Sequence, residues 1–234
     1  MRDVKYANSI EFELSGRSAM FTDPYSHGTQ SFQVPTYEAV KGILRSIYWK
    51  PTFVWIPDEL RVMNRICTEK YSVQRRGRGV VQKRLMDIRY QVRAHFVWNE
   101  NRPEFAEDCD ENKHFRIALR SLAHGGRFPV WLGTSDCCGE VRSAHFGSGV
   151  GFYDNSGIVD FGIMYHGVNY PDEGWNEFTR NSVSRRTWHC VMEDGVIRFA
   201  LPEQCNAEFV RLSRAKRFGS SEDKVAEHAA GIQN

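Results

Sequence analysis

The sequence lacks the features that mark membrane, secreted and zinc-binding proteins. No apolar run reaches the about 18 residues of a membrane-spanning helix, so we expect no membrane partner. The six cysteines form no C-x-x-C pair, and the adjacent Cys137 and Cys138 have poor geometry for holding one metal ion together. Because no signal peptide is recognisable, we expect reduced cysteines and a cytoplasmic location.

The motifs of several common enzyme classes are also missing. The chain has no G-x-x-x-x-G-K-[ST] phosphate loop, no H-E-x-x-H zinc motif and no G-x-S-x-G nucleophile elbow. Its carboxylates are scattered and show no metal-binding spacing, so we expect neither a metal nor a cofactor. The candidates for chemistry that remain are His, Tyr and Lys side chains, a set that suits metal-independent cleavage of RNA.

The charge of the chain is nearly balanced overall but uneven along its length. The net charge is +2, yet residues 75–93 hold seven Arg or Lys and one Asp, whereas residues 100–111 are strongly acidic. A basic stretch in a nearly neutral protein predicts a localised contact with a polyanion.

Apolar patterns define the elements of the first half of the chain. Apolar and polar residues alternate over residues 9–16, which predicts a strand that ends at Gly16. Thr36 can cap a helix that runs to about Trp49. Strand composition follows in residues 52–56 and 60–69, and residues 71–84 have the Gly residues of a hairpin or loop.

A longer alternation over residues 84–98 predicts a strand with one apolar face and one polar, basic face. The apolar face comprises Met86, Ile88, Tyr90, Val92, Ala94, Phe96 and Trp98. A helix is expected next, from about Asp110 to His124, with its apolar stripe on Phe115, Ala118, Leu119 and Leu122 and its end at Gly125 and Gly126.

This order of elements predicts an α+β fold. Strand, helix, strands, helix and strand match the split β-α-β of a ferredoxin-like or RNA-recognition domain, which we place in residues 1–139. Residues 140–213 are rich in strands and turns, including an Asp194-Gly195 hairpin signal, and predict a smaller β-rich domain. Residues 214–234 form a polar tail.

Two short segments carry the candidate chemistry. "GILRSIYWKP" ends its helix on Tyr48, Trp49 and Lys50, and "NKHFRIALRS" places Lys113 and His114 in the first turn of a helix, where backbone N–H groups favour a phosphate. Each signal alone has a plain structural alternative. Tyr48 could seal the edge of the core, the Lys-His pair could be two solvated residues, and the basic strand face could simply be solvated.

These segments, taken together, resemble the Cas-five proteins of type I-C CRISPR systems, the subtype also called Dvulg. The resemblance extends over nearly the whole chain and includes "FELSGRSAMFTDP", "VPTYEAVKGILRSIYWKP", "YQVRAHFVW", "NKHFRIALRS", "FPVWLGT", "VDFGIMY" and "VMEDGVIRFALP". It implies a ferredoxin-like RNA-binding domain of the repeat-associated class and a β-rich C-terminal domain. It also implies a metal-independent endoribonuclease that cuts the CRISPR precursor transcript beside the repeat hairpin and stays on the 5′ handle.

The resemblance implies that Tyr48, Lys113 and His114 are catalytic. We expect His114 to act as general acid or base, Lys113 to stabilise the phosphorane, and Tyr48 to orient the 2′-hydroxyl, because an ordinary phenol is an inefficient base at neutral pH. The expected RNA contacts are Arg75, Arg76, Arg78, Lys83, Arg84, Arg89, Arg93, Trp49 and Lys50, and His95 would share a surface with Arg89 and Arg93.

The expected partners are CRISPR repeat RNA, as precursor and as mature crRNA, and the backbone and large subunits of the type I-C surveillance complex, Cascade. Nonspecific DNA binding is a further expectation, as a side activity. The alternative function is that of a non-catalytic RNA-binding scaffold subunit of the same complex.

Overall fold

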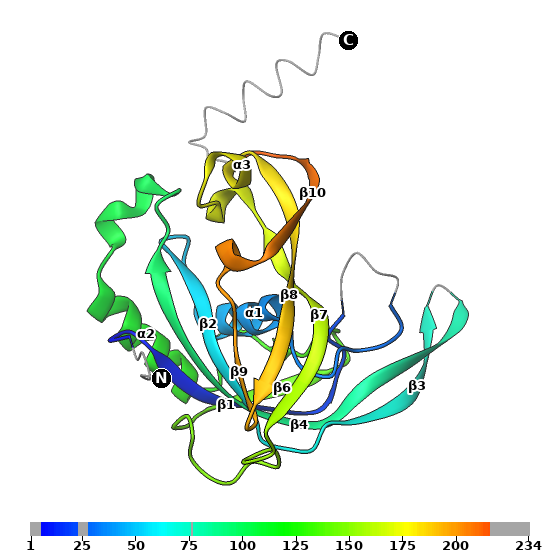
Figure 1. Cartoon of the computed structure of the whole chain (residues 1–234). Helices are drawn as coiled ribbons and strands as arrows, with labels where there is room; N and C mark the ends of the chain where they lie inside the picture. Colours follow the sequence, from blue (N-terminus) through cyan, green and yellow to red (C-terminus); the bar gives the residue numbers. More distant parts are fainter. Residues whose placement is uncertain (1–5, 23–27, 76, 216–234) are drawn as a thin grey trace.

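The computed structural model describes residues 6–22, 28–75 and 77–215, and it confirms the predicted α+β class (Figure 1). The elements are β1 (Ile10–Ala19), α1 (Tyr37–Ile47), β2 (Phe53–Val62), β3 (Cys67–Arg75), β4 (Arg78–Trp98), η1 (Pro103–Asp108), α2 (Glu111–Ala123), β5 (Val130–Trp131), β6 (Cys138–Ser143), β7 (Ile158–Asn169), η2 (Pro171–Glu173), α3 (Glu177–Arg180), β8 (Ser182–Glu193), β9 (Val196–Arg198), η3 (Pro202–Gln204) and β10 (Asn206–Leu212).

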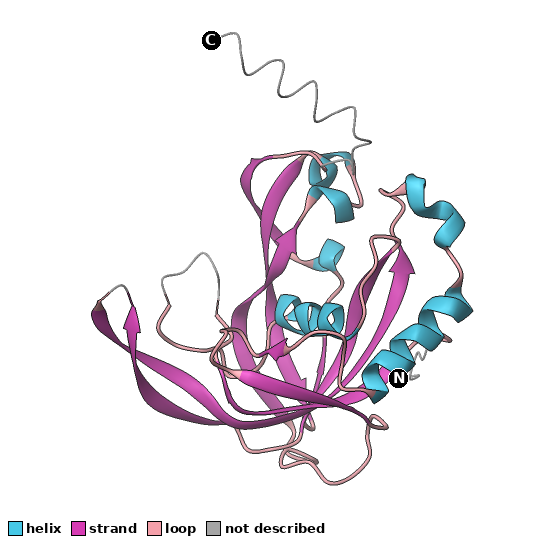
Figure 2. Ribbon diagram, turned by 180° about the vertical axis from the view of Figure 1, so that it is seen from behind, coloured by secondary structure: helices cyan, strands magenta, loops and turns pink. Residues whose placement is uncertain are grey.

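The split β-α-β arrangement is present in the first part of the chain. β1 and β2 flank α1 in the sequence but are not neighbours in the sheet, because β4 lies between them and pairs antiparallel with both. The helix α1 lies between this part of the sheet and the long strands β7 and β8 (Figures 1 and 2). The core therefore lies on the helix-covered face of the sheet.

The first strand is longer than predicted. β1 continues through Gly16, which pairs with Ile88, and ends at Ala19. A Cβ atom on Gly16 would lie 2.3 Å from Cδ1 of Leu132 and 3.1 Å from the carbonyl oxygen of Cys138. Gly16 is therefore needed for close packing of the neighbouring chain, and the prediction that it ends the strand was wrong.

A second close approach leads to a stability prediction. Gly133 has φ +98°, and a Cβ atom there would lie 1.9 Å from the carbonyl oxygen of Met20. We expect Gly133→Ala to lower the free energy of unfolding by at least about 2 kcal/mol, because it combines backbone strain with a clash. Gly42 in α1 has open space around it, so Gly42→Ala should raise the free energy of unfolding by about 0.5–1 kcal/mol. Urea unfolding of both variants tests this, and equal effects would contradict it.

The long strand β4 has the predicted apolar face, but its other face differs from the prediction. Even-numbered residues from Met86 to Phe96 are buried, as expected. Gln91, Arg93 and His95 on the opposite face are also buried. They are covered by residues distant in the sequence, so the expectation of one solvated basic face was wrong for this stretch.

Both main helices begin close to the predicted residues, and each has a side-chain cap, of which only Thr36 was predicted as one. The Thr36 hydroxyl accepts a hydrogen bond from the backbone N–H of Ala39, and the Asp110 carboxylate accepts one from that of Lys113. Gly125 and Gly126 end α2 with positive φ, as predicted. The buried stripe of α2 is rotated from the predicted one: its buried members are His114, Ala118, Ser121 and Leu122. Leu119 is exposed.

The second part of the chain continues the same sheet. β6 pairs with β1, and β9 pairs with β2, so strands from both sides of residue 139 belong to one 10-stranded sheet. The Asp194-Gly195 turn joins β8 to β9 as predicted. The division into domains at 139 stays a prediction, and residues 216–234 of the predicted tail lie outside the described residues. None of the described helices is long and apolar enough to cross a membrane.

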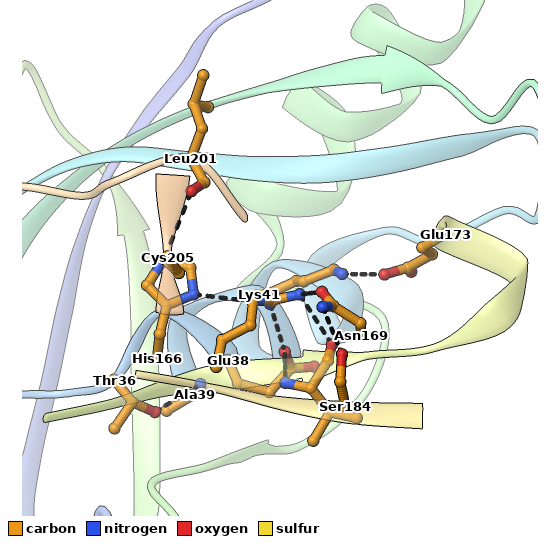
Figure 3. Close-up of polar contacts among 12 residues, drawn as sticks. Thr36, Glu38, Ala39, Lys41, His166, Asn169, Glu173, Ser184, Leu201 and Cys205 are labelled. Atoms are coloured by element: carbon orange, nitrogen blue, oxygen red, sulfur yellow. Dashed lines mark hydrogen bonds and ion pairs between the residues drawn. The ribbon is translucent and has the colours of Figure 1, made fainter. Parts of the chain in front are cut away.

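A buried polar cluster joins α1 to β7, η2 and β8, and we call it the junction network (Figure 3). Its members are Glu38, Lys41, His166, Asn169, Glu173 and Arg186. Lys41 and Arg45 both form ion pairs with Glu173. Since these ion pairs and the His166 contacts are largely removed from water, the network fixes how α1 sits against β7 and η2.

The tautomer of His166 follows from its partners. Its Nε2 lies 2.9 Å from the carbonyl oxygen of Ala200, which can only accept, so Nε2 carries the proton. Its Nδ1 then accepts the Nε–H of Arg186 at 3.1 Å. Burial, together with the nearby Arg186 charge, lowers the pKa of His166 to about 3, so the imidazole is neutral at physiological pH.

This pKa predicts an acid-sensitive junction. The unfolded chain takes up a proton at His166 near pH 6.5, whereas the folded chain resists it down to about pH 3, so stability falls as the pH falls through this window. We expect the free energy of unfolding to fall by up to about 1.4 kcal/mol per pH unit, the value for the uptake of one proton. His166→Gln, whose amide can accept from Arg186 and donate to Ala200, should flatten the slope. Urea unfolding between pH 6.5 and 4.5 measures it, and equal slopes would refute the assignment.

Candidate active site

The predicted catalytic Tyr and His meet inside the protein. Tyr48 is the C-cap residue of α1, and His114 lies in the first turn of α2. The Tyr48 hydroxyl lies 2.7 Å from Nδ1 of His114. Both residues have an exposed fraction of 0%. Two segments separated by 66 residues in the sequence thus supply one directly bonded pair of titratable groups.

The contact at the other ring nitrogen of His114 determines which partner donates this hydrogen bond. Nε2 of His114 lies 2.7 Å from the backbone carbonyl oxygen of Asp108, which can only accept. In the neutral imidazole Nε2 therefore carries the proton, and Nδ1 accepts the phenolic proton of Tyr48. The Asp108 carboxylate is also near, at 3.4 Å from Nε2. The row of groups Asp108, His114, Tyr48 can pass a proton from the phenol to the imidazole.

Lys113 lies beside this row and is tied to the same Asp108. Its ammonium forms an ion pair with the Asp108 carboxylate, which also accepts a hydrogen bond from the hydroxyl of Thr52 at 3.0 Å. The hydrogen bond from Lys113 holds the pKa of Asp108 below its ordinary value. Lys113 is 47% exposed at its side chain, so its charge remains available to a ligand from outside.

The phenol of Tyr48 is held in place by its surroundings. Trp55 donates its indole N–H to the Tyr48 carbonyl oxygen at 2.7 Å, and the guanidinium of Arg127 lies 4.6 Å from the centre of the Tyr48 ring. Burial raises the pKa of Tyr48, and the Arg127 charge opposes that rise. The phenol therefore keeps its proton at neutral pH and is a hydrogen-bond donor.

The structure brings Tyr48, Lys113 and His114 together, but it corrects their expected exposure. His114 is part of the buried stripe of α2, and the phenol of Tyr48 points into the protein toward His114. Sequence reasoning missed Asp108 and Arg127. Asp108 belongs to an acidic run whose members cannot be told apart in the sequence. It is the last residue of the 3-10 turn η1, which places it at the site.

The expected RNA contacts divide into accessible and buried side chains. Trp49, Lys50 and Lys83 are exposed, and Arg89 is half-exposed beside Glu13, its ion-pair partner at 2.8 Å. Arg84 is buried against Gln82 and Asp136. Arg93 is buried between Glu11 and Glu59, and His95 against Asp58. Arg93 and His95 do not form the accessible surface with Arg89 that was predicted, because carboxylates of the chain itself cover them.

The remaining basic residues belong to the β3–β4 hairpin. Arg76 lies outside the described residues, as do the side chains of Arg75 and Arg78. The paired strands of this hairpin project from the body of the molecule on the side away from α2 (Figures 1 and 2). An RNA in contact with both the hairpin and Lys113 would have to extend across the protein.

Potential metal ligands are dispersed in the described part of the chain. No group of three or more His, Cys, Asp or Glu side chains there is placed to hold a metal ion. The six cysteines are all free thiols.

Comparison with known proteins assigns this fold to a class of CRISPR-associated proteins. A crystal structure titled as a CRISPR-associated protein superposes with a TM-score of 0.74 and 34% identity, covering 85% of this chain and 94% of that one. A functionally uncharacterized protein from Streptococcus mutans superposes with a TM-score of 0.73 and 34% identity, over 84% and 94% of the two chains.

The family model Cas_Cas5d, described as "CRISPR-associated protein (Cas_Cas5)", matches residues 9–200. The chain belongs to this Cas5d family. A curated relative from Mannheimia succiniciproducens, named CRISPR pre-crRNA endoribonuclease Cas5d, is 38% identical over 74 residues. That match covers 31% of this chain and 32% of the relative, so it spans about a third of the relative's length.

Proposed function

We propose that this chain is a metal-independent endoribonuclease that cleaves CRISPR precursor transcripts beside the repeat hairpin. The observation that carries the proposal is the Tyr48–His114 hydrogen bond, with Lys113 tied to the same Asp108. A proton acceptor, a phenol and an ammonium are the groups that cleavage through a ribose 2′-hydroxyl requires. The name of the Mannheimia relative supports the same activity.

The proposed reaction is an in-line displacement at phosphorus. The 2′-oxygen attacks the adjacent phosphate, the O2′–P bond forms and the P–O5′ bond breaks. Tyr48 takes the 2′-hydroxyl proton as its own proton passes to Nδ1 of His114. Lys113 stabilises the phosphorane charge and donates a proton to the leaving 5′-oxygen. The products are a 2′,3′-cyclic phosphate and a 5′-hydroxyl, and proton exchange with solvent restores Lys113 and His114.

RNA binding must give the substrate access to the buried pair Tyr48 and His114. Tyr48 and His114 satisfy one another in the free chain, while Lys113 and Arg127 lie at the exposed edge of the site. We place the scissile phosphate at this edge, with Trp49 and Lys50 contacting the strand. RNA binding then opens a path from this edge to the Tyr48 hydroxyl, and the Tyr48–His114 hydrogen bond that carries the proton is kept.

The alternative is a non-catalytic scaffold that holds crRNA. It is favoured by the same burial, because a pair with no exposed surface can be a purely structural one. The discriminating experiment incubates purified protein with a repeat-containing transcript in EDTA. Discrete cleavage is expected from the nuclease, whereas binding without cleavage would establish the scaffold.

The proposed assembly follows from the same assignment. The chain stays on the crRNA 5′ handle after cleavage and joins the backbone and large subunits of a type I-C Cascade in the cytoplasm. The proposed handle or hairpin contacts are Lys83, Arg89 and the hairpin residues Arg75, Arg76 and Arg78. Arg84 and Arg93 instead support the strands, because carboxylates of the chain already surround them. Nonspecific DNA would compete at the accessible cations.

Asp108 provides a test of how the site is positioned. Asp108→Asn keeps the backbone carbonyl that accepts from His114 but removes the carboxylate that anchors Lys113. We expect cleavage to fall by about 10- to 100-fold, because the reacting groups lose their alignment. Glu107→Gln, a charge change at the exposed neighbouring residue, is the matched control and should cleave like the wild type. Equal rates for both variants would remove Asp108 from the site.

A further inference from the structure

A pocket of about 490 Å³ lies where the two parts of the chain meet, next to the junction network. Its lining includes Tyr37, Arg186, Trp98 and Trp175. Tyr6 and His95 also line it, and their rings stack with centres 3.7 Å apart. The pocket has the size of a site for a nucleotide-sized molecule, and its walls carry planar rings.

Two buried polar groups at this pocket lack hydrogen-bond partners among the described residues. They are the hydroxyl of Tyr37 and Nη2 of Arg186. Tyr37 and Arg186 are 1% and 2% exposed. The carboxylate nearest to Nη2, that of Glu38, is 3.7 Å away, beyond hydrogen-bond distance. Buried donors left unpaired are costly, so their presence beside a cavity indicates that a ligand satisfies them.

The remainder of the Arg186 side chain is fully engaged, which orients the unpaired nitrogen. Nε donates to Nδ1 of His166 at 3.1 Å, and Nη1 donates to the carbonyl oxygen of Val168 at 3.1 Å and to the side chain of Asn169. Gly167 makes room for this arrangement, because a Cβ atom there would lie 2.6 Å from Nη2 of Arg186. The junction network thus holds in a fixed position one guanidinium nitrogen that has an ion pair to Glu38 but no hydrogen bond to any described residue.

The chemistry of a ligand that would suit this pocket follows from these groups. The phenol of Tyr37 stays protonated because burial raises its pKa, so both unpaired groups are donors and need oxygen or nitrogen acceptors. Indole rings suit the face of a nucleobase. We propose that this pocket binds one unpaired nucleotide of the RNA, with its base among Trp98 and Trp175 and its acceptors on Tyr37 and Arg186.

The position of the pocket indicates which nucleotide it takes. Trp98 also contacts the catalytic pair, since its ring centre lies 5.9 Å from that of His114. One indole thus separates the pocket from the proposed cleavage site. The bound nucleotide is therefore one close to the scissile phosphate, and the pocket selects where the transcript is cut. This inference rests on the proposed function, because it takes the ligand from the RNA substrate.

The test measures binding separately from cleavage. The binding substrate is a repeat RNA that has a 2′-deoxy nucleotide at the cut and therefore stays intact. A series of such RNAs carries one abasic residue each, at successive positions near the cut. Tyr37→Phe removes only the unpartnered hydroxyl, so the fold should be retained. We expect this variant to raise the Kd of the unmodified-base RNA by about 3- to 10-fold. Tyr153→Phe, whose hydroxyl accepts from the backbone of Ile66 outside the pocket, is the matched control and should bind normally.

The decisive result is coupling between protein and base. One abasic position should weaken binding to the wild type by about 10-fold and make Tyr37→Phe harmless, because the partner of the hydroxyl is then gone. Trp175→Ala, at the partly exposed rim, should weaken binding by a similar factor with the same position dependence.

The outcomes separate the two proposals. If Tyr37→Phe and one abasic position are coupled but an all-ribose transcript is not cleaved, the proposal of a nucleotide pocket stands and the proposal of a nuclease is wrong. If both pocket variants bind RNA with wild-type affinity, or if every abasic position weakens binding equally, the pocket does not bind a nucleotide. A side chain of a partner protein would then be its occupant. Failure of the chain to bind repeat RNA would overturn both.

Discussion

A repeat RNA with a single 2′-deoxy nucleotide just upstream of the cut is expected to bind normally and to remain intact. The reason is that the proposed nucleophile is the substrate's own 2′-oxygen, which the proton acceptors Tyr48 and His114 serve but cannot replace. The measurement pairs a gel-shift with product analysis on a denaturing gel. The all-ribose transcript should give a 2′,3′-cyclic phosphate end under the same conditions.

The position of the deoxy nucleotide provides the control. The same substitution one nucleotide further from the cut leaves the attacking hydroxyl in place, so that transcript should be cleaved. Addition of EDTA should change neither result. Cleavage of the substrate that is deoxy at the cut would show that water attacks the phosphate, and the proposed proton path through Tyr48 would then be wrong.

His114→Ala is expected to lower the rate of cleavage by about 10²–10⁴-fold, the range for one general acid–base group. RNA affinity should change little, because the buried His114 side chain adds little to phosphate binding. Single-turnover cleavage at saturating protein, beside a gel-shift, measures both effects.

A buried His can also matter only for folding, and a matched variant separates the two roles. His124→Ala changes an exposed His at the end of the same helix and should leave cleavage unchanged. His114→Asn keeps a polar group in the cavity and should retain the fold while losing activity. A folded His114→Asn protein that cuts within a few-fold of the wild type would remove His114 from the mechanism.

Local signals in the sequence predicted the local parts of the fold. The cap at Thr36, the helix start near Asp110, the turn at Asp194-Gly195 and the apolar face of residues 84–98 are all present. Each depends on residues close in sequence. The proximity of Tyr48, Lys113 and His114 came from the family resemblance. No spacing rule connects the end of α1 with the start of α2.

The features that sequence reasoning missed depend on contacts between distant segments. Alternation marks one buried face of β4, but Arg93 and Gln91 are buried because Glu11, Glu59 and the segment around Ser148 cover the second face. The predicted apolar stripe of α2 left out His114, which is buried, for the same reason. Which of two neighbouring helix residues faces the core depends on the segments that pack against the helix.

The sheet continues across residue 139, so the two predicted domains share strand pairings. A break there would separate β6 from β1 and β9 from β2, and both pieces would present bare strand edges with unpaired N–H and C=O groups. We therefore expect neither piece to fold when it is expressed alone. Two such fragments made in one cell should recover their fold only by associating with each other.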